Sequence, residues 1–153
     1  MTQRASYARV APDVYKTLLG VHQYLERSGL EIDLLNLVFL RASQINGCAY
    51  CIDMHWKDLR AAGVAEQKLY MLDAWREWTG YSERERAALE WTEAVTRLTH
   101  QDVPDDVYAR AHAQFSDEEL AKLTLGVTSI NAWNRFNIAF RTPAGSYQPA
   151  HQK

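Results

Sequence analysis

A long stretch without proline restricts the fold of this chain more than any other feature. The four prolines stand at positions 12, 104, 143 and 149, so none interrupts residues 13–103. Within that stretch apolar residues recur at helical spacing, as in Val14, Leu18, Val21 and Leu25. The sustained alternation of polar and apolar residues between tight turns, which marks β-hairpins, is missing. The sequence therefore predicts an all-α protein.

Capping residues and glycines divide the chain into about seven expected helices. Ser82 with Glu85, and Ser116 with Glu119, form the capping-box pattern, in which two side chains satisfy backbone N–H groups at a helix start. Glycines at positions 29, 47, 63 and 80 end or bend helices. The expected helices cover about residues 12–29, 31–46, 48–63, 66–78, 82–98, 104–115 and 116–141. Together they predict a helical bundle.

Length and composition are those of a single globular domain. The chain has 153 residues, of which 47% are hydrophobic and 24% are charged, and a chain of this size buries enough surface for a substantial core. We expect one helical domain over residues 1–142. Residues 143–153 hold two prolines and a glycine and are expected to form a flexible C-terminal tail.

Charge and hydropathy exclude several classes of partner. The formal net charge is −2, with both signs dispersed along the chain, which gives no basic surface for nucleic acid. No apolar run approaches the roughly 20 residues of a membrane span. Residues 1–10 lack the apolar centre of a secretory signal. We therefore expect a cytoplasmic protein without a membrane or nucleic-acid partner.

Chemically reactive side chains concentrate between Gly47 and His55. If a helix starts at Cys48, then Cys51 at i+3 and His55 at i+7 lie on one face of it. A helix N-terminus favours a thiolate, and His55 can accept the thiol proton. The second thiol can then form an intramolecular disulfide. The pattern therefore predicts a dithiol redox centre.

Two other interpretations of the cysteine pair remain open at this point. Free cysteines are often buried as small hydrophobic residues, although that leaves Gly47 and His55 unexplained. Two thiolates and one imidazole also suit zinc, but the chain has no third cysteine and its other histidines are remote in sequence. A thioredoxin fold is disfavoured because its Cys-x-x-Cys motif lies in a βαβ unit. We expect no metal site.

The segment from Arg41 to His55 reads Arg-Ala-Ser-Gln-Ile-Asn-Gly-Cys-Ala-Tyr-Cys-Ile-Asp-Met-His. It resembles the core signature of the AhpD-like alkylhydroperoxidases, within the carboxymuconolactone decarboxylase superfamily. Residues 130–135, Ile-Asn-Ala-Trp-Asn-Arg, resemble the final helix of the same subfamily. The resemblance spans about residues 12–142.

This resemblance implies an all-helical AhpD-like fold and a homo-oligomer, commonly a trimer or a hexamer. It also implies a peroxidase in which Cys51 attacks the peroxide, Cys48 resolves the product and His55 belongs to the proton relay. The expected partners are a peroxide substrate and a thiol or dithiol reductant protein. No cofactor is expected.

Two positions depart from the family pattern. The family usually has a glutamate twelve residues before the first cysteine, as the distal end of the proton relay, and Asn36 stands there in this chain. An amide can orient an imidazole or a water, but it cannot accept a proton at neutral pH. The founding peroxidases carry a histidine between the cysteines, where this chain has Tyr50. Asn36 is thus the candidate relay position, and we expect less efficient peroxidase turnover with the dithiol intact.

Several other residues carry weaker arguments. The chain has five tryptophans, at positions 56, 75, 78, 91 and 133. We expect them in the core or in a subunit interface rather than around a cofactor. Asn131, Asn134 and Arg135 are polar groups on an apolar helix, and they either line the site or bond a neighbouring subunit. His22 is expected in the core with its hydrogen bond satisfied. No glycine-rich phosphate loop is present, so a nucleotide cofactor is not expected.

The sequence thus favours a thiol-dependent peroxidase that reduces organic hydroperoxides through a Cys48–Cys51 dithiol/disulfide cycle, with His55 as proton relay. One alternative is a non-peroxidatic enzyme of the carboxymuconolactone decarboxylase type, whose members generally lack the paired cysteines. The other is an oligomeric sensor in which the dithiol responds to redox state or holds a metal.

Overall fold

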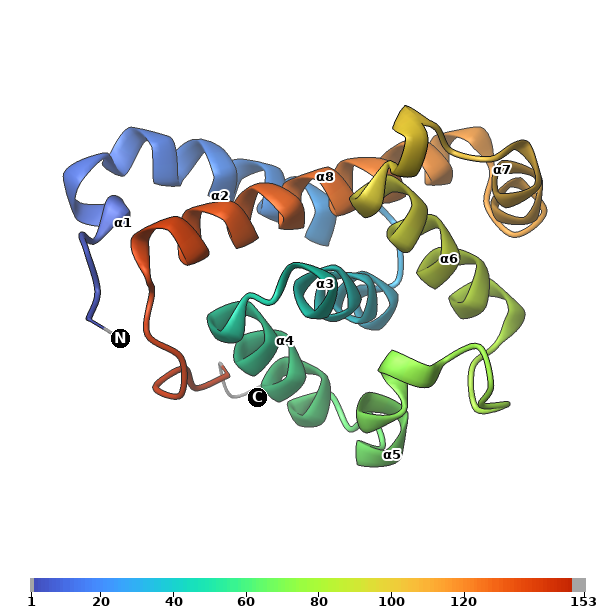
Figure 1. Cartoon of the computed structure of the whole chain (residues 1–153), viewed down its shortest axis with the longest axis horizontal. Helices are drawn as coiled ribbons and strands as arrows, with labels where there is room; N and C mark the ends of the chain where they lie inside the picture. Colours follow the sequence, from blue (N-terminus) through green and yellow to red (C-terminus); the bar gives the residue numbers. More distant parts are fainter. Residues whose placement is uncertain (1, 150–153) are drawn as a thin grey trace.

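The computed structural model describes residues 2–149, and within this range the chain is all helical, without a β-strand (Figure 1). The helices are α1 (Tyr7–Val10), α2 (Pro12–Glu26), α3 (Ile32–Asn46), α4 (Ala49–Ala61), α5 (Glu66–Tyr70), α6 (Glu83–Arg97), α7 (Asp105–His112) and α8 (Asp117–Phe140), with short 3₁₀ segments η1 (Leu72–Ala74) and η2 (Thr99–Gln101). The predicted all-α fold is confirmed. Helices α2 to α8 correspond to the seven expected helices, and the one-turn α1 is additional.

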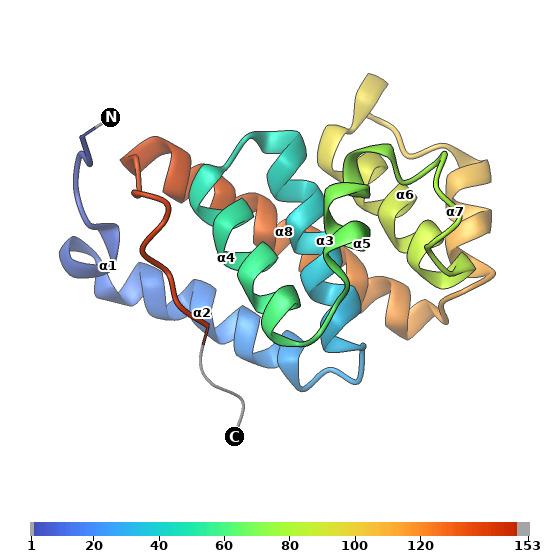
Figure 2. The same cartoon turned by 90° about the horizontal axis from the view of Figure 1, so that it is seen from below.

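Helix α3 lies at the centre of the molecule and packs against α4, α6 and α8 (Figures 1 and 2). Its buried residues point to two sides, because Leu35 and Val38 belong to one hydrophobic cluster while Leu37 and Leu40 belong to a second. A helix that is apolar around most of its circumference is typical of a core position. The helix that leads directly to the cysteines is therefore buried in the core and packed on two sides.

Both predicted capping boxes are present at the starts of α6 and α8. Ser82 Oγ accepts from the Glu85 backbone N–H at 3.2 Å, and the Glu85 carboxylate accepts from the Ser82 N–H at 2.9 Å. Ser116 and Glu119 repeat this exchange at 3.2 and 2.8 Å. These reciprocal bonds satisfy backbone donors that the helix itself leaves unpaired.

The prediction of one helix over residues 66–78 is wrong for the second half of that range. The structure has α5, then the single turn η1, and irregular chain up to α6. The Arg86 guanidinium donates to the carbonyl oxygens of Trp75 and Trp78, each at 3.0 Å, and to that of Arg76 at 2.9 Å. Bonds to this side chain replace the backbone bonds that a continued helix would make, so the chain turns here instead.

Residues 143–149, the described part of the expected tail, run along α4. Lys57 Nζ donates to the carbonyl oxygens of Gly145 and Tyr147, at 3.2 and 3.0 Å. The Tyr147 hydroxyl donates to Asp58 Oδ1 at 2.7 Å. Residues 150–153 of that tail lie outside the described residues, and the division into domain and tail stays a prediction.

Exposed apolar side chains are distributed over several helices. They include Val14 and Tyr24 on α2, and Leu125 and Ile138 on α8. Across residues 2–149, no helix has the combination of length and hydropathy that a membrane span requires.

Candidate active site

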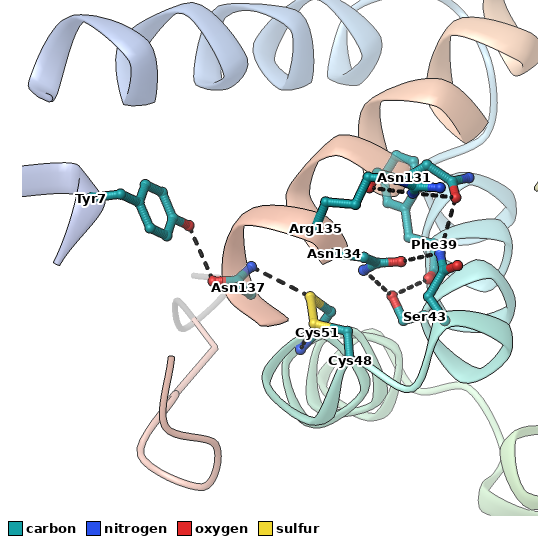
Figure 3. Close-up of a disulfide and its surroundings, with 10 residues drawn as sticks. Tyr7, Phe39, Ser43, Cys48, Cys51, Asn131, Asn134, Arg135 and Asn137 are labelled. Atoms are coloured by element: carbon teal, nitrogen blue, oxygen red, sulfur yellow. Dashed lines mark hydrogen bonds between the residues drawn. A yellow bond between two sulfur atoms is a disulfide. The ribbon is translucent and has the colours of Figure 1, made fainter. Parts of the chain in front are cut away.

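The turn between α3 and α4 places the two cysteines. Gly47 ends α3 in the left-handed conformation (φ 70°), which glycine adopts without the steric cost that a Cβ would bring. Cys48 is the N-cap of α4, and its Sγ accepts from the Cys51 N–H at 3.4 Å. The two sulfur atoms form a disulfide (Figure 3), and each cysteine is only 1% exposed. The predicted helix start at the cysteine pair is confirmed.

Asparagines of α8 hold this turn in place. Asn134 is fully buried and donates to Ser43 Oγ at 3.0 Å, while the Cys48 N–H donates to the Ser43 carbonyl oxygen at 3.0 Å. Asn46 Nδ2 donates to Asn134 Oδ1 at 2.8 Å and to Asn131 Oδ1 at 2.9 Å. These bonds tie the end of α3 to α8, and they fix where α4 begins.

These bonds show where the polar residues of the last helix lie within one chain, and their contact with a neighbouring subunit stays a prediction. Asn131 and Asn134 bond within the chain and are not among the residues that line the cavity described below. Arg135 donates to the carbonyl oxygen and to Oδ1 of Asn131, at 2.8 and 2.9 Å. Asn131 and Asn134 therefore hold the end of α3, while Arg135 is exposed and bonds Asn131 (Figure 3).

His55 is buried beside the cysteines, one helical turn after Cys51. Its Nδ1 lies 3.1 Å from Oδ1 of Asn36. An amide oxygen only accepts, so Nδ1 carries the proton and Nε2 keeps its lone pair. Nε2 has no hydrogen-bond partner among the described residues. Burial, with a smaller contribution from the charge of His22, lowers the pKa of His55 to about 3, so the ring is neutral at neutral pH.

A cavity of about 170 Å³ lies between α2, α4 and α8, and the side chains of Cys51 and His55 form part of its wall. Cys48 is not among the described lining residues. The rest of the wall is mainly aromatic and aliphatic, including Tyr7, Tyr15, Phe39, Tyr50, Met54 and Trp133. One sulfur of the pair therefore faces an apolar space large enough for a small organic molecule.

His22 does not lie in the core, where the sequence analysis places it. Its side chain is 32% exposed, lies 3.6 Å from Glu26, and contributes to the cavity wall. The expectation was wrong because the apolar face of α2 at this level meets the cavity rather than a packed neighbour.

Two functional candidates escaped the sequence analysis, Tyr7 and Asn137. Asn137 Nδ2 donates to Cys51 Sγ at 3.4 Å, and the Tyr7 hydroxyl donates to Asn137 Oδ1 at 3.1 Å (Figure 3). Asn137 could have been found, because asparagines recur at every third position of α8, at residues 131, 134 and 137. Tyr7 could not, because nothing near it in the sequence points to Cys51.

The tryptophans lie largely where the sequence places them. Trp75 and Trp91 are buried in the two hydrophobic clusters, and Trp56 and Trp78 pack against the second. Trp133 packs against the first cluster and also lines the cavity. Within residues 2–149 no three histidine, cysteine, aspartate or glutamate side chains gather in a way that could ligate a metal ion.

Comparisons with known proteins point to one family. The model of the carboxymuconolactone decarboxylase family matches residues 12–94. The chain is 40% identical over 146 residues to the uncharacterised protein YdfG of Bacillus subtilis (strain 168), and the alignment covers 95% of this chain and 99% of that protein.

Solved structures agree in fold. A protein of unknown function from Agrobacterium tumefaciens, with a suggested role as antioxidant defence protein AhpD, has a TM-score of 0.91 and 41% identity, and the match covers 95% of this chain and 100% of that chain. The debrominase Bmp8 in its apo form has a TM-score of 0.78 at 20% identity, over 88% of this chain and 73% of that chain. At this lower identity the likeness shows a shared fold alone.

Proposed function

The chain belongs to the carboxymuconolactone decarboxylase family and is AhpD-like, and from this premise we propose that it is a thiol-dependent peroxidase for organic hydroperoxides. The observation that carries the proposal is the position of Cys51. Its sulfur is paired with that of Cys48. Cys51 also shares the wall of an apolar cavity with His55, whose Nε2 has no hydrogen-bond partner within residues 2–149.

In the first step the Cys51 thiolate attacks the terminal oxygen of a hydroperoxide, ROOH. An S–O bond forms and the O–O bond breaks, which gives a sulfenic acid on Cys51 and an alcohol, ROH. The proton that the Cys51 thiol gives up ends on the departing alkoxide oxygen. Nε2 of His55 is a basic atom of the cavity wall with no hydrogen-bond partner among the described residues, and we assign it the role of accepting a hydrogen bond from the O–H of the peroxide.

In the second step Cys48 resolves the sulfenic acid. Its sulfur attacks Cys51 Sγ, the S–O bond breaks and water leaves, so that the disulfide forms. A dithiol reductant then takes the disulfide back to two thiols and is itself oxidised. We propose a thiol or dithiol protein for this role. Assembly of the chain as a trimer or hexamer also stays a proposal.

The size of the cavity restricts the proposed substrate. A cavity of about 150 Å³ holds a molecule of benzene, and the cavity beside Cys51 measures about 170 Å³. Its aromatic wall favours an apolar group over a charged one. We therefore propose a compact hydroperoxide with one ring or a short branched alkyl group, rather than a long-chain lipid hydroperoxide.

The test is hydroperoxide consumption with a dithiol reductant, comparing the wild type with Cys51→Ser and Cys48→Ser. We expect Cys51→Ser to remove turnover. In a separate measurement without the reductant, Cys48→Ser should consume about one equivalent of peroxide and stop at the sulfenic acid, because no second protein thiol is present to form the disulfide. Thr128→Ala, an exposed change on α8, should match the wild type.

Equal rates for wild type and Cys51→Ser would contradict the proposal and favour a non-peroxidatic enzyme of the same family. Zinc bound at one ion per chain in the purified reduced protein would favour the metal-sensing alternative. Mild oxidation should instead remove about two mass units from the metal-free protein, since a disulfide forms by the loss of two hydrogens.

A further inference from the structure

We propose that the side-chain amide of Asn137 stabilises the thiolate form of Cys51 and that Tyr7 positions this amide. The proposal rests on the proposed function, in which Cys51 carries the reacting sulfur. In the oxidised state of the structure, Asn137 Nδ2 already lies 3.4 Å from Cys51 Sγ. Asn137 is 5% exposed and Tyr7 is 9% exposed, so both bonds are shielded from water.

The orientation of the amide follows from what each neighbour can do. A thiolate sulfur can only accept, so the amide must turn Nδ2 toward Cys51. Its oxygen then faces Tyr7, whose hydroxyl donates to it at 3.1 Å. Burial, followed by smaller contributions from Tyr50 and Tyr15, raises the pKa of Tyr7 to about 12. The hydroxyl therefore keeps its proton, and remains a donor, over the pH range in which thiols titrate.

Among the described residues, no lysine or arginine lines the cavity to stabilise a thiolate by a permanent positive charge. Its described titratable groups, apart from Cys51, are three tyrosines and two histidines: Tyr7 of α1, Tyr15 and His22 of α2, and Tyr50 and His55 of α4. The groups that face it from α3 and α8 do not titrate, and no lysine, arginine, aspartate or glutamate is among the described lining residues.

The proposal assigns the stabilisation to neutral donors that lie beside the sulfur. His55 is uncharged at neutral pH and directs its proton toward Asn36, away from the sulfur. The N-terminus of α4 contributes through its dipole. The amide of Asn137 is the side-chain donor in contact with Cys51 Sγ, and a hydrogen bond to the charged form lowers the pKa of a thiol.

Tyr7 is held firmly enough to serve as the support. The Arg4 N–H donates to the Phe140 carbonyl oxygen and the Arg4 guanidinium to that of Ala139, both at 3.1 Å. The Tyr7 ring packs against Phe136 and Phe140, with ring centroids 5.2 and 5.7 Å away. Arg4 and Tyr7, which precede the segment matched by the family model, thus contact the end of α8 beside Asn137.

The deciding experiment measures the pKa of Cys51 from the pH dependence of its alkylation by iodoacetamide. All variants are made on Cys48→Ser, so that a single thiol reacts and serine still caps α4. Asn137→Leu removes the donor without adding charge, Asn137→Asp replaces it with a repelling carboxylate, and Tyr7→Phe removes only the supporting hydroxyl. Thr128→Ala and Tyr108→Phe, both remote from the cavity, are the matched controls.

We expect the pKa of Cys51 to rise by about one unit with Asn137→Leu, by more with Asn137→Asp and by less with Tyr7→Phe, while the controls stay unchanged. The alkylation rate near pH 7 should then fall about tenfold with Asn137→Leu, in proportion to the thiolate fraction. In a protein that keeps Cys48, Asn137→Leu should also shift the thiol–disulfide equilibrium with glutathione toward the Cys48–Cys51 disulfide.

An unchanged pKa in Asn137→Leu would overturn the role of Asn137, even if Asn137→Asp raised it. If circular dichroism shows that neither Asn137 variant folds, Tyr7→Phe decides, and an unchanged pKa there overturns the proposal as a whole. Failure here is distinct from failure of the proposed function, because peroxide consumption by the wild type and its loss in Cys51→Ser are measured separately.

Discussion

The pairing of Asn36 with His55 is the residue-scale feature that most affects the proposed chemistry. The Nδ1–Oδ1 distance of 3.1 Å puts the amide where the family resemblance implies a carboxylate. A carboxylate at this position would stabilise an imidazolium, whereas an amide oxygen stabilises only the neutral ring. His55 in this chain is therefore an acceptor through Nε2 and a weak base.

The first prediction concerns this pair. Asn36→Glu should raise the pKa of His55 from its value of about 3, because the new carboxylate favours the protonated ring. Peroxide turnover at neutral pH should rise about tenfold, a part of what a positioned acid–base group commonly contributes. Steady-state kinetics with an organic hydroperoxide measure the change.

Asn36→Gln is the matched control for that experiment, since it lengthens the side chain equally but remains an amide. It should show no gain. An Asn36→Glu protein that folds but turns over no faster would mean that another group completes the proton transfer.

Residue contacts in the site were predictable only where the family spacing or the helix itself fixes them. Asn36 was located by counting back twelve residues from Cys48, and it does contact His55. Helical spacing from Cys48 likewise predicted that Cys51 and His55 lie on the same face of α4. Tyr7 lies 130 residues from its partner Asn137, and only the packing of α1 onto the end of α8 brings the two together.

At the scale of elements, one buried carboxylate joins α3 and α6 to the chain between α5 and α6. Glu93 of α6 is 4% exposed. It accepts from Arg41 Nε of α3 at 2.9 Å, from Trp75 Nε1 at 2.8 Å and from Arg76 at 2.7 Å. Because α3 leads directly into the cysteine turn, this carboxylate helps fix the element on which the site depends.

The second prediction follows from that burial. Glu93→Gln leaves the 5% exposed Arg41 without the charge that compensates it in the interior, although Asp73 still bonds Arg41 at 2.6 Å. Losing one partner of a buried pair costs about 3 kcal/mol at the lower end of the usual range. Urea denaturation should show this loss in the free energy of unfolding.

Glu90→Gln is the control, because Glu90 pairs with the half-exposed Arg110 and surface pairs contribute only about 0–1 kcal/mol. Equal losses in the two variants would show that the Glu93 network is no stronger than a surface pair.

The third prediction is the pH dependence of the same group. Burial alone raises the pKa of Glu93, but the hydrogen bonds from Trp75 and Arg76 and the charge of Arg41 outweigh it and lower the pKa to about 2. The folded-state pKa lies below the ordinary value of 4.5, so the stabilisation is fully present above pH 4.5 and is lost as the pH falls toward 2.

The free-energy difference between wild type and Glu93→Gln should therefore shrink steadily when unfolding is measured at about pH 6, 4 and 3. A difference that stays constant over this range would mean that the carboxylate is not held in its charged form by its neighbours.

Element boundaries were predictable where the signal is local. Serine caps, Gly47 and the apolar spacing of α3 and α8 act within one or two turns, and these helices begin and end close to their expected positions. The break after α5 was not predictable, because it depends on Arg86, which reaches carbonyl groups 8 to 11 residues earlier in the chain. A long-range side-chain bond of this kind leaves no mark in local periodicity.

At the scale of the whole molecule, two hydrophobic clusters share helices. The first contains Val38 and Trp91, and the second contains Leu40 and Leu89, so α3 and α6 each contribute to both. The sequence predicted helices with apolar faces, but it did not indicate that α3 would be covered on two sides. That property depends on which helices pack around it.

This sharing leads to the last prediction, that the monomer unfolds in one cooperative transition. Leu40 is 1% exposed and belongs to the second cluster, and Leu40→Ala should reduce the free energy of unfolding by about 2–5 kcal/mol. If the clusters are coupled through α3 and α6, tryptophan fluorescence and far-UV circular dichroism must shift together along one curve. Leu125→Ala, at an exposed position of α8, should change stability little.

Because the tryptophans lie in both clusters, a biphasic fluorescence curve in Leu40→Ala would show that the second cluster unfolds by itself. The turn that carries the cysteines would then be held by the first cluster and α8 alone.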